Sequence, residues 1–340
     1  MHSPGAAPLL SGPLFAPLVI KDEGDSWGTG CRSYRDVTDR FRSQPGSLKV
    51  VESGPARTIT ESVMDYKGSR IVLQTIGYRD WPVIEFRMRI DWREERKMLK
   101  LAVPTVFRGG TLICEIPGGA SRRPGDGEEH VFGRWALVEG ETGRRRTSLA
   151  VIGCGPHGLD FKDGELRISV LRSAAYCHER GLKLAASPAP KFMDQGIHKL
   201  RFLVTAGDAG EVRRSVTALA DWLSAPPYAL AHLPLGGLDG AKKDNHGKYQ
   251  TGQAPDEDTE RFDLLSLDPP SVRLCACKRS GDAKALILRL HETAGLPTEV
   301  RLVLMEPLRV IRLEFRPFEI KTLRVERSGA WREAGLITET

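Results

Sequence analysis

The chain has 340 residues, of which 40% are hydrophobic and 28% charged, a composition typical of a soluble globular protein with two or three cores. Its formal charge of +6 is spread along the sequence. The one tight basic group, residues 144–146, falls in a predicted turn, so we expect no nucleic-acid partner. No apolar run approaches the roughly 18 residues that a membrane helix needs, and we expect no membrane association.

The first 20 residues are broken by prolines and lack both a basic start and an apolar centre, so they make a poor signal peptide. The six cysteines form no CxxC pair, although Cys275 and Cys277 lie two apart on one face of a predicted strand. We expect buried free thiols rather than disulfides or metal ligands. A reducing, cytoplasmic location fits that expectation best.

Alternation of apolar and polar residues dominates the chain. In residues 83–92 every second side chain from Ile84 to Trp92 is apolar, and those between are charged, which predicts a half-buried antiparallel strand. The same pattern recurs in residues 69–76, 99–103, 166–172, 198–204, 285–290 and 299–305. Clusters of glycine, proline, aspartate and serine separate these runs, so we predict an all-β protein built as a large sandwich.

One helix is predicted near residues 211–223, where apolar residues recur at helical spacing before a double proline. Residues 237–261 are polar and nearly free of aliphatic side chains, which predicts a flexible loop. The expected division is therefore a large β domain at 1–236, the loop at 237–261 and a small β domain at 262–340.

Intrinsic catalytic and metal motifs are missing from the sequence. The histidines form no HxxxH, HxH or HExxH pattern, so we expect no metal site in this chain. No GxSxG elbow occurs. Cys154 and His157 lie close together in GCGPHG, but the glycines favour a turn between strands over a thiol–imidazole pair.

Two polar stretches are candidates for sugar recognition. KDEGDSWG places the carboxylate of Asp25 next to Trp27, and carboxylates bind sugar hydroxyls while an indole stacks on the ring; the alternative is an exposed turn. DQGIH places Asp194 and His198 around Gly196, just before a strand. Alternation puts His198 on the apolar face of that strand, where it either caps the inner layer or points into a groove at the end of the sheet.

Several stretches together resemble the C-terminal region of glycoside hydrolase family 38, the α-mannosidases. In chain order they are KDEGDSWG (21–28), ESGPARTITE (52–61), IEFRMRIDWREERKMLKLAVP (84–104), EIPGGASRRP (115–124), GRWALVEG (133–140), LRISVLRS (166–173), MDQGIHKLRF (193–202), LILRLHETAG (286–295) and RPFEIKTLRV (316–325). The resemblance implies a β supersandwich of the galactose-mutarotase type with a small C-terminal β domain. It also implies that Asp25, Trp27 and His198 lie near the sugar cleft. If the DQGIH turn lies at the rim of the sandwich, we expect Asp194 to shape a sugar-facing groove together with His198.

The family's zinc ligands and catalytic aspartate belong to an N-terminal α/β domain whose motifs cannot be placed in this sequence. We therefore expect no catalytic residue and no cofactor in this chain, and expect the chain alone to be inactive. Its partners would be an α-mannoside and a zinc-bearing catalytic domain, in a longer gene product or a partner chain. A stand-alone carbohydrate-binding protein and a mutarotase-like epimerase are the alternative functions, and a homo-oligomer is compatible with the sequence.

Overall fold

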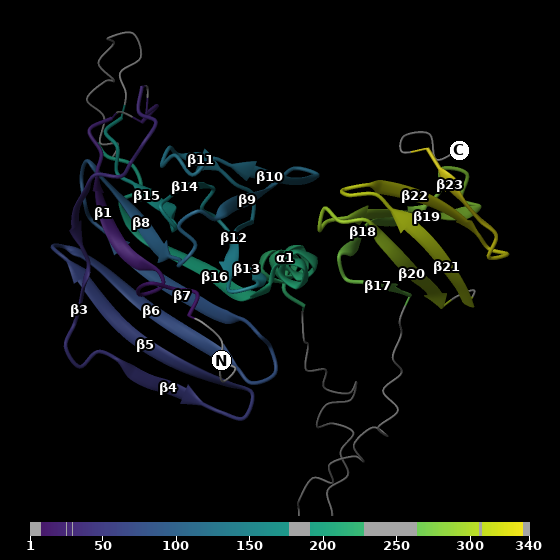
Figure 1. The fold of residues 1–340 in the computed structure, drawn as a ribbon, viewed down its shortest axis with the longest axis horizontal. Helices are drawn as coiled ribbons and strands as arrows, with labels where there is room; N and C mark the ends of the chain where they lie inside the picture. Colours follow the sequence, from purple (N-terminus) through teal and green to yellow (C-terminus); the bar gives the residue numbers. More distant parts are fainter. Residues whose placement is uncertain are drawn as a thin grey trace, which may run out of the picture.

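The computed structural model describes residues 8–24, 26–28, 30–176, 191–227, 264–305 and 308–335. Within these ranges the chain forms one α-helix and four antiparallel β-sheets, which confirms the predicted all-β class (Figure 1). The loop predicted at 237–261 lies outside the described residues.

Two large sheets form the first part of the fold. The ten-stranded sheet contains, in spatial order, β10 (Gly119–Arg123), β9 (Thr111–Ile116), β12 (Trp135–Thr142), β13 (Arg145–Gly153), β16 (Gly196–Asp208), β7 (Ile84–Trp92), β6 (Ser69–Tyr78), β5 (Arg57–Tyr66) and β3 (Arg42–Ser43), with β4 (Lys49–Ser53) also paired to β5. The six-stranded sheet contains β11 (His130–Val131), β14 (Gly158–Lys162), β15 (Glu165–Arg172), β8 (Lys97–Pro104), β1 (Ala16–Lys21) and β2 (Val37–Arg40).

The main core lies between these two sheets. Leu99 and Leu101 of β8 pack in one cluster with Phe86 and Ile90 of β7 and with Phe202 of β16. These are residues that strand alternation assigns to the inner face, so the period-two pattern predicts the core correctly.

The helix α1 (Ala209–Ser224) covers part of the outer face of the ten-stranded sheet. Its apolar stripe includes Val212 and Val216, which pack in a second cluster with Ile152 of β13 and Leu203 of β16. The helical spacing seen in the sequence is therefore core packing.

The N-terminus of α1 is capped by Asp208, whose Oδ1 accepts hydrogen bonds from the backbone N–H groups of Gly210 (2.9 Å) and Glu211 (3.2 Å). Replacing Asp208 by alanine should lower the free energy of unfolding by about 1 kcal/mol, because two helix N–H groups lose their acceptor. Asp208→Asn should retain most of the stability. Urea denaturation of the three proteins measures the difference, and equal losses in both variants would contradict the capping role.

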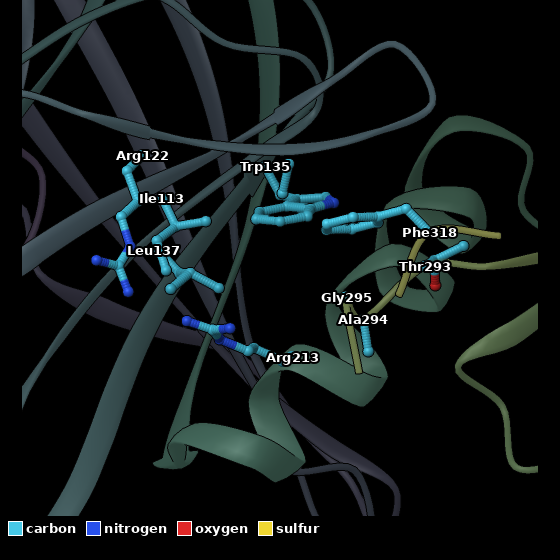
Figure 2. A pocket seen from close by; sticks show the side chains of 10 residues that line it. Ile113, Arg122, Trp135, Leu137, Arg213, Thr293, Ala294, Gly295 and Phe318 are labelled. Carbon is cyan, nitrogen blue, oxygen red and sulfur yellow. The ribbon is translucent and has the colours of Figure 1, made fainter. Parts of the chain in front are cut away.

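The C-terminal part contains two smaller sheets. One has β17 (Leu265–Asp268), β20 (Thr298–Met305) and β21 (Leu308–Phe315); the other has β18 (Val272–Arg279), β19 (Ala285–Glu292), β22 (Ile320–Glu326) and β23 (Trp331–Ala334). They enclose a separate apolar cluster that includes Leu288, Leu302 and Phe315. Figure 2 shows Phe318 of this part pointing toward Trp135 of β12 at a small cavity, which Thr293 also lines.

Among the described cysteines all are free, but only Cys114 is buried. The expectation of buried thiols is wrong for Cys31, Cys154, Cys275 and Cys277, which are exposed. Cys31 and Cys154 lie in loops, and Cys275 and Cys277 lie on β18, an edge strand of its sheet. In the part of the chain that the structure describes, no helix has the length and apolarity to span a bilayer.

Candidate functional site

The candidate site lies at one end of the six-stranded sheet, where the segment after β1 passes the end of β15. The side chain of Asp22 is fully buried and binds the guanidinium of Arg172 with both carboxylate oxygens, at 2.8 Å (Nε–Oδ2) and 3.1 Å (Nη2–Oδ1). Its Oδ1 also accepts the backbone N–H of Gly24 at 3.1 Å. A buried charge is tolerated only when it is paired and hydrogen-bonded, so Asp22 must stay next to Arg172. The ion pair therefore holds the start of the segment after β1 against the end of β15.

Arg172 also holds the rest of this segment. Its Nη1 donates to the backbone carbonyl of Ser26 at 3.4 Å, and its guanidinium carbon lies 5.1 Å from the centre of the Tyr34 ring. Gly28 has a positive φ of 65°, and a Cβ there would lie 3.1 Å from the Tyr34 hydroxyl. Burial raises the pKa of Tyr34, so its hydroxyl stays protonated. The neighbouring Trp27 is consequently presented at the surface, 73% exposed.

The DQGIH turn meets the same arginine from the other side. The backbone N–H of Arg172 donates to Oδ2 of Asp194 at 2.9 Å, and Nε2 of His198 donates to the Asp194 carbonyl at 2.8 Å. Asp194 has a φ of 54° and Gly196 one of 130°, which bends the chain sharply into β16. His198 shares the core-facing row with Ile90, as alternation predicts, and its imidazole bonds within its own turn.

The structure thus brings Trp27 and Asp194 to two sides of Arg172 and adds His198 behind Asp194. Oδ1 of Asp194 makes no hydrogen bond with any described residue, and Asp194 is exposed. Asp25 lies outside the described residues.

A buried ionic network continues from Tyr34 along the same sheet. Lys100 of β8 is 0% exposed, and its Nζ lies 2.6 Å from Asp160 Oδ2 and 2.5 Å from Glu129 Oε2. Asp160 also binds Arg35, and Lys100 Nζ lies 5.9 Å from the Tyr34 ring centre. The positive charges of Lys100 and Arg35 are matched by the negative charges of Asp160 and Glu129. The buried network is therefore neutral without a ligand.

Sequence reasoning missed the residues that organise the site. Asp22 was within the quoted KDEGDSWG stretch, but its partner Arg172 lies 150 positions later and nothing in the local pattern connects them. The alternation of Lys100 with leucines in its strand predicts a solvent-facing side chain. The side chain is in fact buried, with Glu129 and the Tyr34 ring beside its ammonium group.

Among the described residues, no three His, Cys, Asp or Glu side chains are arranged to hold a metal ion. Cys154 lies in the turn between β13 and β14, as predicted, and the His157 ring bonds the carbonyl of Gly133 at 3.1 Å.

Comparison with known proteins identifies the family. The profile of the "Glycosyl hydrolases family 38 C-terminal domain" matches residues 20–189, and the chain belongs to this family. An α-mannosidase from Enterococcus faecalis V583 superposes with a TM-score of 0.68 at 14% identity, covering 92% of this chain and 38% of its own. A second family 38 protein from Enterococcus faecalis gives a TM-score of 0.66 at 13% identity, covering 92% and 40%.

These two structures share the fold of this chain, including the predicted sandwich and smaller C-terminal sheets. The chain spans about two-fifths of their length. No curated protein matches the sequence significantly.

Proposed function

We propose that this chain is the carbohydrate-facing C-terminal β region of an α-mannosidase, working with a zinc-bearing catalytic domain to hydrolyse terminal α-mannosides. Family membership supports the enzyme class, and the Enterococcus faecalis relative is an α-mannosidase. The observation that carries the proposal is the double role of Arg172, whose side chain anchors the Trp27 segment while its backbone binds Asp194.

The arrangement of Trp27 and Asp194 on two sides of Arg172 suits a sugar. An exposed indole can cover the C–H face of a pyranose, and Oδ1 of Asp194 can accept a hydroxyl hydrogen bond. Arg172 and His198 act as positioning residues, because their polar atoms are engaged in holding the segment and the turn. In this proposal the catalytic domain supplies zinc and bond cleavage.

Hydrolysis of 4-nitrophenyl α-D-mannopyranoside tests this function. The chain should show no turnover alone, and should produce zinc-dependent turnover with the part of the Enterococcus faecalis α-mannosidase that it does not match, supplied as a separate polypeptide or a fusion. Chelator-sensitive turnover by the chain alone would place catalysis within it. An inactive combination of two folded parts, with no mannoside binding by the chain, would reject the proposal.

Trp27→Ala should raise the KM of the active combination by about five- to tenfold, because a sugar-stacking indole contributes roughly 1 kcal/mol. The free energy of unfolding should change by no more than about 0.5 kcal/mol, since the side chain is largely exposed. Trp331→Ala, a partly exposed tryptophan on β23, is the matched control and should leave KM unchanged. Equal effects of both substitutions would contradict a sugar-facing role for Trp27.

A further inference from the structure

A cavity of about 180 Å³ lies between the outer face of the ten-stranded sheet, the helix α1 and the C-terminal part of the chain (Figure 2). Arg122 of β10 and Arg213 of α1 line it, and Figure 2 shows both guanidinium groups at the end opposite Phe318. Every other lining residue in the described part of the chain is uncharged. The cavity therefore has a cationic end and neutral walls.

The guanidinium group of Arg122 is available to a ligand. Arg122 lies on an edge strand and is the direct cross-strand partner of Ile113, so its side chain belongs to the outer sheet face that α1 covers. The residue is exposed, and its side chain forms no hydrogen bond or ion pair with any described residue. Its donors therefore have no partner to give up when a ligand binds.

Arg213 is fixed by one of its nitrogens and leaves two others open. Its Nε binds Oε1 of Glu139, whose carboxylate is 1% exposed. Its Nη1 and Nη2 bond no residue in the described ranges, and neither atom is buried. Both nitrogens can therefore donate to a ligand while the Glu139 contact holds the side chain in place.

The charges around this end favour an anion. Arg146 also approaches Glu139, with Nη2 3.1 Å from Oε2, so two guanidinium groups share one carboxylate. Glu141 lies opposite Arg146 across the β12–β13 pair but is exposed and forms no ion pair with a described residue. Three guanidinium groups, those of Arg122, Arg146 and Arg213, therefore have one carboxylate within ion-pair distance, which leaves two positive charges unmatched.

This excess selects the chemistry of the ligand. A phosphate monoester carries nearly two negative charges and three terminal oxygens, so it can accept hydrogen bonds from two guanidinium groups at once. A carboxylate has a single charge and two oxygens, which one guanidinium group satisfies. We propose that this cavity binds a small phosphate monoester, with its phosphate at Arg122 and Arg213 and its uncharged organic group against the apolar walls that include Leu137 and Phe318.

The wall around Phe318 is already formed without a ligand. The fully buried carboxylate of Glu292 accepts the backbone N–H groups of Ala294 (2.8 Å), Gly295 (2.8 Å) and Phe318 (3.0 Å), so its negative charge is compensated there. Gly295 has a φ of 70°, and a Cβ at this position would lie 2.5 Å from the Phe318 ring. The cavity shares no residue with the Trp27–Asp194 site, so the inference does not rest on the proposed function.

Isothermal titration calorimetry of the full chain tests the ligand class with phenyl phosphate, inorganic phosphate and benzoate. Phenyl phosphate should bind saturably and about tenfold more tightly than either other probe, because it alone combines the dianion with an apolar group. Equal binding of inorganic phosphate would overturn the monoester, and equal binding of benzoate would overturn the phosphate. No saturable binding of phenyl phosphate would overturn the site.

Three variants locate the binding. Arg122→Gln should weaken phenyl phosphate binding by about tenfold without changing the melting temperature, because the side chain has no other described partner. Arg144→Gln, an exposed arginine in the β12–β13 turn that does not line the cavity, is the matched control and should bind normally. Equal affinities of these two variants would overturn the role of Arg122.

Ala120→Leu tests the apolar part of the cavity without changing a charge. Ala120 lines the cavity, so a leucine there should fill space that the organic group needs and remove most of the advantage of phenyl phosphate over inorganic phosphate. An unchanged ratio of the two affinities in the folded variant would place the organic group elsewhere and overturn the proposal.

Discussion

Replacing Lys100 by methionine is expected to lower the free energy of unfolding by about 3–5 kcal/mol, the typical loss when one partner of a buried ion pair is removed. Methionine fills a similar volume, so the loss comes from charge rather than from a cavity. Asp160, which is fully buried, keeps Arg35 but loses the ammonium group 2.6 Å away, and Glu129 loses its contact at 2.5 Å. Urea denaturation monitored by tryptophan fluorescence measures the change.

The exposed Lys199 on β16 provides a matched control, because Lys199→Met removes the same charge from an open sheet face. Its expected change is within about 0.5 kcal/mol. Similar losses in the two variants would mean that Lys100 gains nothing from its buried partners, and that the network is incidental to stability.

Trp92→Ala is the second substitution with a large expected effect, about 3–5 kcal/mol. Trp92 is fully buried at the end of β7, opposite Gly196 of the Asp194 turn. Its indole N–H bonds the hydroxyl of Ser173, the residue after Arg172, and its ring stacks near Phe41 with centroids 6.4 Å apart. The substitution therefore leaves a cavity and a buried hydroxyl without its donor, directly beneath the candidate site.

Trp92→Phe separates these two contributions, because it keeps most of the apolar contact and removes the indole N–H. We expect a loss of about 1–2 kcal/mol for this variant, measured by the same denaturation experiment. If Trp92→Phe were as damaging as Trp92→Ala, the hydrogen bond between the two sheets would outweigh packing, contrary to this account.

Local pattern predicted most of the secondary structure. The strand at 83–92 corresponds to β7, and the helix near 211–223 corresponds to α1, because alternation and helical spacing are properties of short segments. The resemblance to family 38 rested on motifs in order along the chain, and it predicted the sandwich and the smaller sheets.

The organisation of the site depends on pairings that no short segment contains. Lys100 and Asp160 are 60 positions apart, and each would be expected in water if considered alone. Arg172 had no distinguishing feature in the sequence, yet it joins the Trp27 segment to the Asp194 turn.

Along the chain, successive groups of strands enter the two large sheets in turn. This order determines where such a region can be exchanged between enzymes. The six-stranded sheet takes β1, β2, β8, β11, β14 and β15, while the strands between them in sequence enter the ten-stranded sheet. A recombination breakpoint between residues 43 and 165 would therefore join parts of both layers from different parents, with mismatched pairing and inner faces. Functional chimeras should tolerate crossovers outside the sandwich and fail when the junction falls within it, so the whole double layer is inherited or transplanted as a single indivisible unit.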